Sequence, residues 1–336
     1  MFFLMNGILV LIYLLGIIFA CVLFTNAIES LGSKLKLANS ATGGILAVIG
    51  TTLPETIVPI IAILSSFLLN KPAGLNIAQG AIIGSPFMLS VFAMSLLGIC
   101  LVFLKRKTLN IDNNMVFRFY KYFLITYSIG ILASFIHKFE FKLLVSLFLV
   151  ISYVFFVKRT LAKGKEDFIQ EETEELFFKK ILKAKSEKIC LILFQILISL
   201  VFLVIFSHLF VHKIAFISEI LNLNPMILSL IITPFATELP ECINSIIWIK
   251  AKKDDLAVSN LLGATVFQAV IPMSIGIIFT PWILPDFILL NSFVVVFYSL
   301  FVVLTLLITK KISLLPLLTG LIFYFGYIVF ILLHSL

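Results

Sequence analysis

Charged residues are scarce in this chain of 336 residues: Asp, Glu, Lys and Arg make up 12% of it, and hydrophobic residues make up 61%. A soluble protein of this length would need many more polar residues to cover its surface. Apolar runs of about 20 residues recur along the chain, and each is long enough to cross a bilayer core of roughly 30 Å. The runs lack the alternating polar face of barrel strands, so the sequence predicts an all-α polytopic membrane protein.

Signatures of several other protein classes are also missing. The four cysteines lie far apart in apolar segments with no CxxC pair, which favours small buried side chains over disulfides or a thiolate metal site. There is no nucleotide-binding glycine loop, no zinc-protease helix motif and no GxSxG, so ATP hydrolysis and proteolysis have no support. We expect no organic cofactor. The first apolar run has no basic flank and is too long for a cleaved signal, so we interpret it as the first span.

Ten membrane-spanning helices are predicted. They cover residues 5–33, 41–69, 77–104, 118–137, 141–158, 189–218, 226–250, 256–281, 287–309 and 312–334. Ten spans place both termini on one side, and that side carries only four of the 25 Lys and Arg residues: Lys71, Lys138, Lys142 and Lys213. By the positive-inside rule both termini face out of the cell (inner) membrane. This topology explains the net charge of +8 without a nucleic-acid partner.

The chain divides into two halves of five spans. We predict a first five-helix repeat over residues 1–158, a cytoplasmic amphipathic connector over 159–188 and a second five-helix repeat over 189–336. The connector mixes acids and bases, and Glu175 and Lys179 are spaced to form an i,i+4 ion pair on a helix.

The two halves share a sequence repeat. The second span contains "GTTLPE" and the seventh contains "ATELPE", which at an offset of 186 pairs Thr51 with Thr237, Pro54 with Pro240 and Glu55 with Glu241. In the next span of each half, an offset of 179 pairs Ala78 with Ala257, Gly84 with Gly263, Val91 with Val270, Met94 with Met273 and Ser95 with Ser274. Because each half has an odd number of spans, the repeats must be inverted, which is a transporter architecture.

The chemistry of the repeated motif points to a cation. Proline removes a backbone donor and disfavours a continuous helix, so we expect broken helices 2 and 7 whose freed carbonyls can act as ligands. Thr51 and Glu55 share a helix face, and Glu238 lies within reach of Glu241 on the other helix. Where the halves meet, two carboxylates and their oxygen neighbours suit a hard cation such as Ca²⁺. A merely structural proline kink is the alternative, which two inverted copies disfavour.

These residues resemble the cation/Ca²⁺ antiporter superfamily, which includes the sodium/calcium exchangers. The resemblance is carried by "NAIESLGSKLKLANSATGGILAVIGTTLPET" with "AQGAIIGSPFMLS", and by "FISEILNLNPMILSLIITPFATELPEC" with "AVSNLLGATVFQA". It implies two inverted five-helix repeats with Glu55 and Glu241 as paired Ca²⁺ ligands. It further implies flanking or accessory ligands at Thr51, Thr237, Thr52 and Ser85, and at Gln268 in the second repeat. The outer spans match only in hydropathy.

The sequence departs from the family pattern in ways that bear on the counter-ion. Glu238 replaces a serine or threonine and adds a third acid, whereas Leu89 stands where the first repeat usually offers a polar amide and cannot ligate anything. Three crowded acids disfavour full ionisation, which makes H⁺ a candidate counter-ion with Glu238 as its carrier. The alternative counter-ion is Na⁺.

The expected function is secondary active antiport of Ca²⁺, or a similar divalent cation, against Na⁺ or H⁺ by alternating access. The alternatives are an inverted-repeat cation channel or uniporter, and a membrane enzyme whose paired acids perform acid/base chemistry. Duplicated acids related by a pseudo-two-fold favour transport over catalysis, so we do not expect an enzyme. The expected partners are the lipid bilayer and small inorganic cations, and the expected state is a monomer.

Overall fold

The computed structural model describes residues 2–34, 52–69, 72–163, 175–183, 188–221 and 223–335. Within these residues all regular elements are helices, and one isolated β-bridge joins Thr108 to Ser313. Seven helical segments of this part of the chain are long and apolar enough to cross a membrane. The predicted all-helical, polytopic membrane class is therefore confirmed.

The first half of the chain forms a series of helices joined by short loops. They are α1 (Phe2–Lys34), α3 (Leu53–Leu69), α4 (Ala73–Phe87), η2 (Met88–Ala93), α5 (Met94–Phe103), α6 (Asn113–Leu132), η3 (Ala133–Phe135) and α7 (Phe139–Lys163). The segment η2 is a π-helix that joins α4 to α5, so the predicted third span is continuous but locally widened. The prediction missed this widening. Because α7 runs on to Lys163, the predicted connector begins inside a helix.

The second half follows the connector helix α8 (Phe177–Leu182). Its helices are α9 (Ile189–Leu221), α10 (Pro225–Thr237), α11 (Leu239–Lys250), α12 (Asp254–Gln268), α13 (Ile271–Phe279), α14 (Asp286–Thr309) and α15 (Leu314–Ser335). The predicted break in the seventh span is confirmed, since α10 ends at Thr237 and α11 begins at Leu239. The predicted break in the second span lies next to residues 35–51, which are outside the described residues, so that prediction is not tested.

A second break interrupts the eighth span, which was predicted to be one helix over residues 256–281. Here α12 ends at Gln268 and α13 begins at Ile271. The physical reason is Pro272, which lies in the first turn of α13. Its ring clashes with the carbonyl four residues earlier and its missing N–H removes a helical hydrogen bond, so the helix restarts just before it.

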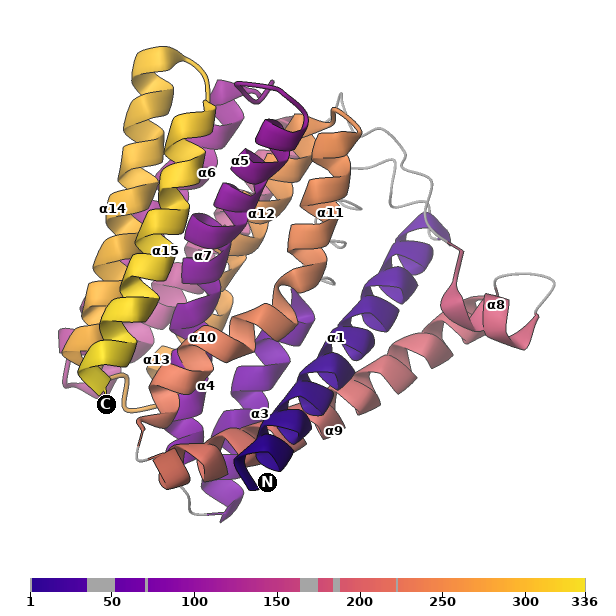
Figure 1. Cartoon of the computed structure of the whole chain (residues 1–336), viewed down its shortest axis with the longest axis vertical. Helices are drawn as coiled ribbons and strands as arrows, with labels where there is room; N and C mark the ends of the chain where they lie inside the picture. Colours follow the sequence, from indigo (N-terminus) through magenta and orange to yellow (C-terminus); the bar gives the residue numbers. More distant parts are fainter. Residues whose placement is uncertain are drawn as a thin grey trace.

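The helices pack as a main bundle with a long pair against its side. α1 and α9 lie along each other and cover α3 and α4, whereas α5 to α7 and α10 to α15 surround the larger core (Figure 1). α10 crosses α4 closely, because a side chain at Gly80 or Gly84 would collide with the α10 backbone. Glycine at this spacing allows membrane helices to approach without intervening side chains.

Both termini lie at one end of the bundle (Figure 1). At the other end, three loops are tied together. Arg106 forms a paired interaction with Asp254 at the start of α12, and the Asp254 carboxylate raises the pKa of the Arg106 guanidinium. Leu109 donates its N–H to the carbonyl of Ile312 at 3.0 Å. The basic residues of these loops therefore gather on the side away from the termini.

The connector is anchored between α1 and α9. The backbone N–H groups of Phe177 and Phe178 donate to the side chains of Asn26 and Gln195, at 3.0 and 2.9 Å. The Gln195 amide also donates to Asn26 at 3.0 Å, and Leu176 is fully buried beside them. The predicted ion pair between Glu175 and Lys179 forms at 2.7 Å, but Glu175 precedes the helix, which begins at Phe177.

Candidate cation site

Two helix starts bring the motif acids to the middle of the bundle. Glu55 lies in the first turn of α3 and Glu241 in the first turn of α11. Proline is the second residue of each of these helices, where its missing N–H breaks no helical hydrogen bond. The unpaired N–H groups and the dipole of a helix start favour negative charge, so each motif pairs an acid with the end of a helix that stabilises it.

The break between α10 and α11 contributes the third acid. Glu238 is the residue between these helices, and its backbone N–H donates to the carbonyl of Pro234 at 2.8 Å. Each of Glu55, Glu238 and Glu241 offers a carboxylate oxygen, and these oxygens all lie within 4.8 Å of one another. All three side chains are buried, at 2%, 0% and 2% exposure. The structure thus brings the three predicted acids together.

Gln268 completes this cluster from the last turn of α12. Its side-chain amide donates to Glu55 and, at 3.2 Å, to Glu238. Gln268 therefore holds an acid from each half of the chain. Its own amide oxygen is buried without a hydrogen-bond donor. Its counterpart at the offset of 179 is Leu89, which is fully buried and apolar, so the second half supplies more of the polar groups.

Four oxygens in this cluster accept no hydrogen bond from the residues that the structure describes. They are one carboxylate oxygen each of Glu55, Glu238 and Glu241, and the amide oxygen of Gln268. A buried polar atom without a partner costs about 1–3 kcal/mol, and more if it is charged. In the described part of the chain, the three acids form no ion pair with a lysine or arginine. All four of these atoms are oxygens, the ligand type that a hard cation prefers.

The remaining predicted ligands lie around the cluster in different ways. Thr52 and Ser85 are both buried, and Ser85 is a hydrogen-bonding neighbour of Glu238. Thr237 is also buried, but its hydroxyl donates to the carbonyl of Thr233 at 3.4 Å. The hydroxyl proton of Thr237 is therefore used within its own helix, and only the lone pairs of the hydroxyl oxygen remain to bind a cation. Thr51 lies outside the described residues.

Asn260 is a functional candidate that the sequence reasoning missed. Its side-chain amide donates to the carbonyl of Glu241 at 3.2 Å and to the hydroxyl of Ser245 at 3.1 Å. Asn260 thereby fixes the first turn of α11 against α12. An amide inside an apolar run is itself a signal, because polar groups within membrane spans are costly and usually serve a purpose.

α1 also borders the site. The buried thiol of Cys21 on α1 lies close enough to Glu238 and Glu241 to interact with their charges. No spacing in the sequence connects Cys21 to the motif, since α1 reaches the site only through tertiary packing.

Comparison with known proteins identifies a family. The family model described as "Sodium/calcium exchanger protein" matches residues 6–161 and 191–336. The fold is similar to the solved H⁺/Ca²⁺ exchanger CAX, with a TM-score of 0.72 and 17% identity over 97% of this chain and 86% of that chain. It is also similar to the sodium-calcium exchanger NCX_Mj, with a TM-score of 0.58 and 20% identity over 97% and 98% of the chains.

A curated relative is the putative antiporter CaxA of Alkalimonas amylolytica. It is 29% identical over 89 residues, which is 26% of this chain and only 28% of that protein. The family model spans both halves of this chain and includes all three clustered acids. This is a family of membrane transporters and not of enzymes, so the alternative of a membrane enzyme is excluded. The chain belongs to the sodium/calcium exchanger family.

Proposed function

We propose that this chain is a secondary active antiporter, which carries Ca²⁺ across the membrane in exchange for Na⁺ or H⁺ by alternating access. The observation that carries the proposal is the buried cluster of Glu55, Glu238 and Glu241, which both halves of the chain supply. Three carboxylates within 4.8 Å repel one another strongly away from water, and a divalent cation offsets that repulsion. Ca²⁺ accepts six to eight oxygen ligands in flexible geometry, which matches this donor set.

The proposed ligands have different roles. Glu55, Glu238 and Glu241 supply charge, and Gln268 supplies an amide oxygen while it orients two of the acids. Thr52 and Ser85 supply hydroxyl or carbonyl oxygens from the first half. Thr237 completes the set through its backbone carbonyl or its hydroxyl lone pairs, and its counterpart in the repeated motif, Thr51, is proposed to have the same role.

The chain is proposed to span the membrane ten times, as inverted repeats over 1–158 and 189–336 with a connector between them. Seven spans satisfy length and hydropathy, and α3, α6 and the pair α10–α11 supply the other three. Matched packing supports the repeat. α5 packs against α15 as α13 packs against α7, and α1 packs against α11 as α9 packs against α3.

Irregular backbone at equivalent positions gives further support to the repeat. The π-helical segment η2 includes Ser90 and Val91, and at the offset of 179 these correspond to Ala269 and Val270. Those two residues form the break between α12 and α13. Each half thus departs from regular α-helix at the same point of its third span, with a π-helical turn in the first half and a break in the second. π-helical segments occur frequently at functional sites.

The orientation proposed for the chain places both termini outside the cell membrane. The termini share one end of the bundle, and the loops containing Arg106, Lys252 and Lys311 lie at the other (Figure 1). The positive-inside rule assigns the basic end to the cytoplasm.

Of the two counter-ions we favour H⁺. Na⁺ would need its own set of oxygen ligands, yet Leu89 contributes none at the place where the second half has Gln268. Protons need only the acids themselves, and the third acid, Glu238, gives the cluster one carboxylate more than the repeated motif provides. Glu238 would then take up a proton as Ca²⁺ leaves.

Uptake of ⁴⁵Ca²⁺ into proteoliposomes, under separately imposed pH and Na⁺ gradients, tests the proposal. We expect accumulation when the lumen is more acidic than the medium, because protons leaving the vesicle drive Ca²⁺ inward. A lumen loaded with Na⁺ at equal pH is expected to give little uptake. Accumulation driven only by Na⁺ would reverse the counter-ion assignment. Uptake that needs neither gradient would support the channel or uniporter.

A further inference from the structure

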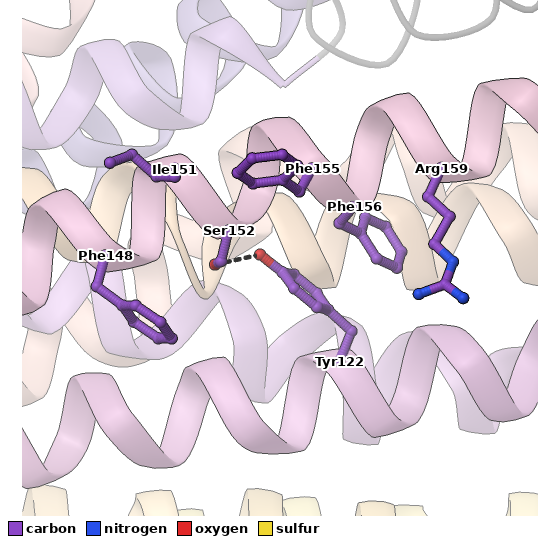
Figure 2. Close-up of a pocket in the computed structure, with 7 residues that line it drawn as sticks. All are labelled: Tyr122, Phe148, Ile151, Ser152, Phe155, Phe156 and Arg159. Carbon is purple, nitrogen blue, oxygen red and sulfur yellow. Dashed lines mark hydrogen bonds between the residues drawn. The ribbon is translucent and has the colours of Figure 1, made fainter.

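A groove between α6 and α7 lies on the outer surface of the bundle, and its lining is separate from the residues of the acid cluster. It has a volume of about 450 Å³, within the range of about 300–1,000 Å³ typical of ligand sites. Tyr122 of α6 and residues of α7 line it (Figure 2): Phe148, Ile151, Ser152, Phe155, Phe156 and Arg159. Three of the apolar side chains, Phe148, Ile151 and Phe155, are 55%, 46% and 67% exposed, so this face meets lipid.

The floor of the groove has its polar groups satisfied. The hydroxyls of Tyr122 and Ser152 hydrogen-bond each other at 2.7 Å (Figure 2). Ser152 also donates to the carbonyl of Leu149 at 2.7 Å. Phe156 stacks on Tyr122 with ring centroids 4.2 Å apart, and its edge meets Phe119 at 5.3 Å. The floor is therefore a largely aromatic surface whose two hydroxyl protons are both used in hydrogen bonds within the protein, and an alkyl chain can lie on it.

One end of the groove is basic. Arg159 lines that end, and Lys158 precedes it on α7. α6 runs antiparallel to α7, because Tyr122 pairs with Ser152, whereas Phe119, one turn earlier on α6, meets Phe156, one turn later on α7. Arg118 and Lys121 of α6 therefore lie toward the same end as Arg159. α6 contains no acid, and the single acid of α7, Glu140, lies in its first turn at the opposite end.

Arg159 stands next to the end of the span Phe139–Thr160, at the level where lipid phosphates lie. We propose that this groove binds an anionic phospholipid. One acyl chain lies over the aromatic floor, and the phosphate is held by Arg159 with help from the neighbouring basic residues. Charge complementarity selects this occupant, because basic groups beside membrane spans attract anionic headgroups. The orientation proposed above places the lipid in the cytoplasmic leaflet; binding itself does not depend on transport.

Native mass spectrometry of the full-length protein in detergent tests the proposal, with phosphatidylglycerol or phosphatidylcholine added at equal concentration. The parent protein is expected to retain phosphatidylglycerol preferentially. Arg159→Gln is expected to weaken that retention about fivefold, the effect of one basic group near the headgroups. Ile151→Trp fills the groove without changing charge and is expected to reduce retention of both lipids.

Lys188→Gln is the matched control. Lys188 is an exposed basic residue just before α9, a helix that packs on α1 and α3 rather than on α6 or α7. Retention equal to the parent is expected for this control. The proposal is overturned if Arg159→Gln retains phosphatidylglycerol as the parent does, if the two lipids are retained equally, or if Lys188→Gln loses as much as Arg159→Gln. Because the readout is binding, a failure of the antiporter proposal would leave this result unaffected.

Discussion

At the scale of single residues, the site is asymmetric although the motif is repeated. Glu55 and Glu241 are equivalent, but Glu238 stands opposite Thr52 and Gln268 opposite Leu89. The second half therefore supplies two carboxylates and the amide that bridges to the first half. In the proposed mechanism the symmetric pair holds the cation, and Glu238 contributes charge to it and also serves the counter-ion.

The symmetric pair gives the first prediction. Glu55→Gln and Glu241→Gln each remove one negative charge from the proposed cation ligands. Among the described residues at this site, only the other two acids of the cluster then remain as anions. An uncharged amide cannot offset a divalent cation away from water, so we expect ⁴⁵Ca²⁺ uptake to fall tenfold or more. Glu219→Gln is the control, because Glu219 is exposed on α9. Normal uptake in Glu55→Gln would exclude it as a ligand.

The third acid gives a prediction that separates binding from coupling. Glu238→Gln leaves Glu55 and Glu241 in place and keeps the shape of the side chain, but it removes the proposed proton carrier. We expect net uptake driven by a pH gradient to disappear, while exchange of ⁴⁵Ca²⁺ for Ca²⁺ at equal pH continues. Net uptake that still follows the pH gradient in this variant would assign the proton to another group.

At the scale of elements, the fold depends on close approach of α4 to α10. A methyl group at Gly84 would meet the carbonyl oxygen of Leu230 and the ring of Pro234. Forcing the helices apart costs roughly 1–3 kcal/mol, so Gly84→Ala should lower the melting temperature in detergent. Gly326 on α15 has no atom within 4 Å of that position. Gly326→Ala should be neutral or stabilising, because alanine favours helix. An equal loss in both variants would refute the packing argument.

The connector supplies a second prediction at this scale. Asn26 and Gln195 accept hydrogen bonds from the first N–H groups of α8, and both side chains are buried. Asn26→Leu leaves the Phe177 N–H unpaired, at a cost of about 1–3 kcal/mol. We expect α8 to detach and limited proteolysis to cut residues 175–183 faster. Lys179→Gln removes a partly exposed ion pair and should leave the cleavage rate unchanged. Equal cleavage in Asn26→Leu and the parent would show that the anchor is not needed.

The elements also show how far sequence reasoning reaches. The spans and the break at Glu238 follow from hydropathy and from the repeated proline, which are local signals. The break at Ala269 was not predicted, although Pro272 is a local signal for it, because the surrounding residues form one apolar run that suggests a single helix. The π-helical segment η2 depends on packing and leaves no local pattern. Glu55, Glu238 and Glu241 were predictable as a group because the repeat doubles the motif, whereas Cys21 and the anchor at Asn26 arise only from tertiary contacts.

At the scale of the whole molecule, inversion of the repeats ties topology to the site. If the two halves enter the membrane in opposite directions, the starts of α3 and α11 point toward each other from opposite sides. Two helix starts can then face one cation from both halves, as the cluster within 4.8 Å requires. A wrong number of spans in either half would separate the acids. The inverted topology of the two halves and the geometry of the site therefore depend on each other, whereas the orientation of the termini is independent of the site geometry.

Labelling with a membrane-impermeant maleimide tests that orientation. Cys100 and Cys190 are first replaced by serine, since they are the cysteines that are not buried. Ile283 is 64% exposed between α13 and α14, at the end of the bundle that carries the termini, so Ile283→Cys should be labelled in intact cells. Lys107 is exposed between α5 and α6, at the basic end, and Lys107→Cys should react only after the cells are permeabilised. The reverse pattern would place the termini in the cytoplasm, and labelling of both sites in intact cells would contradict an odd number of spans between them.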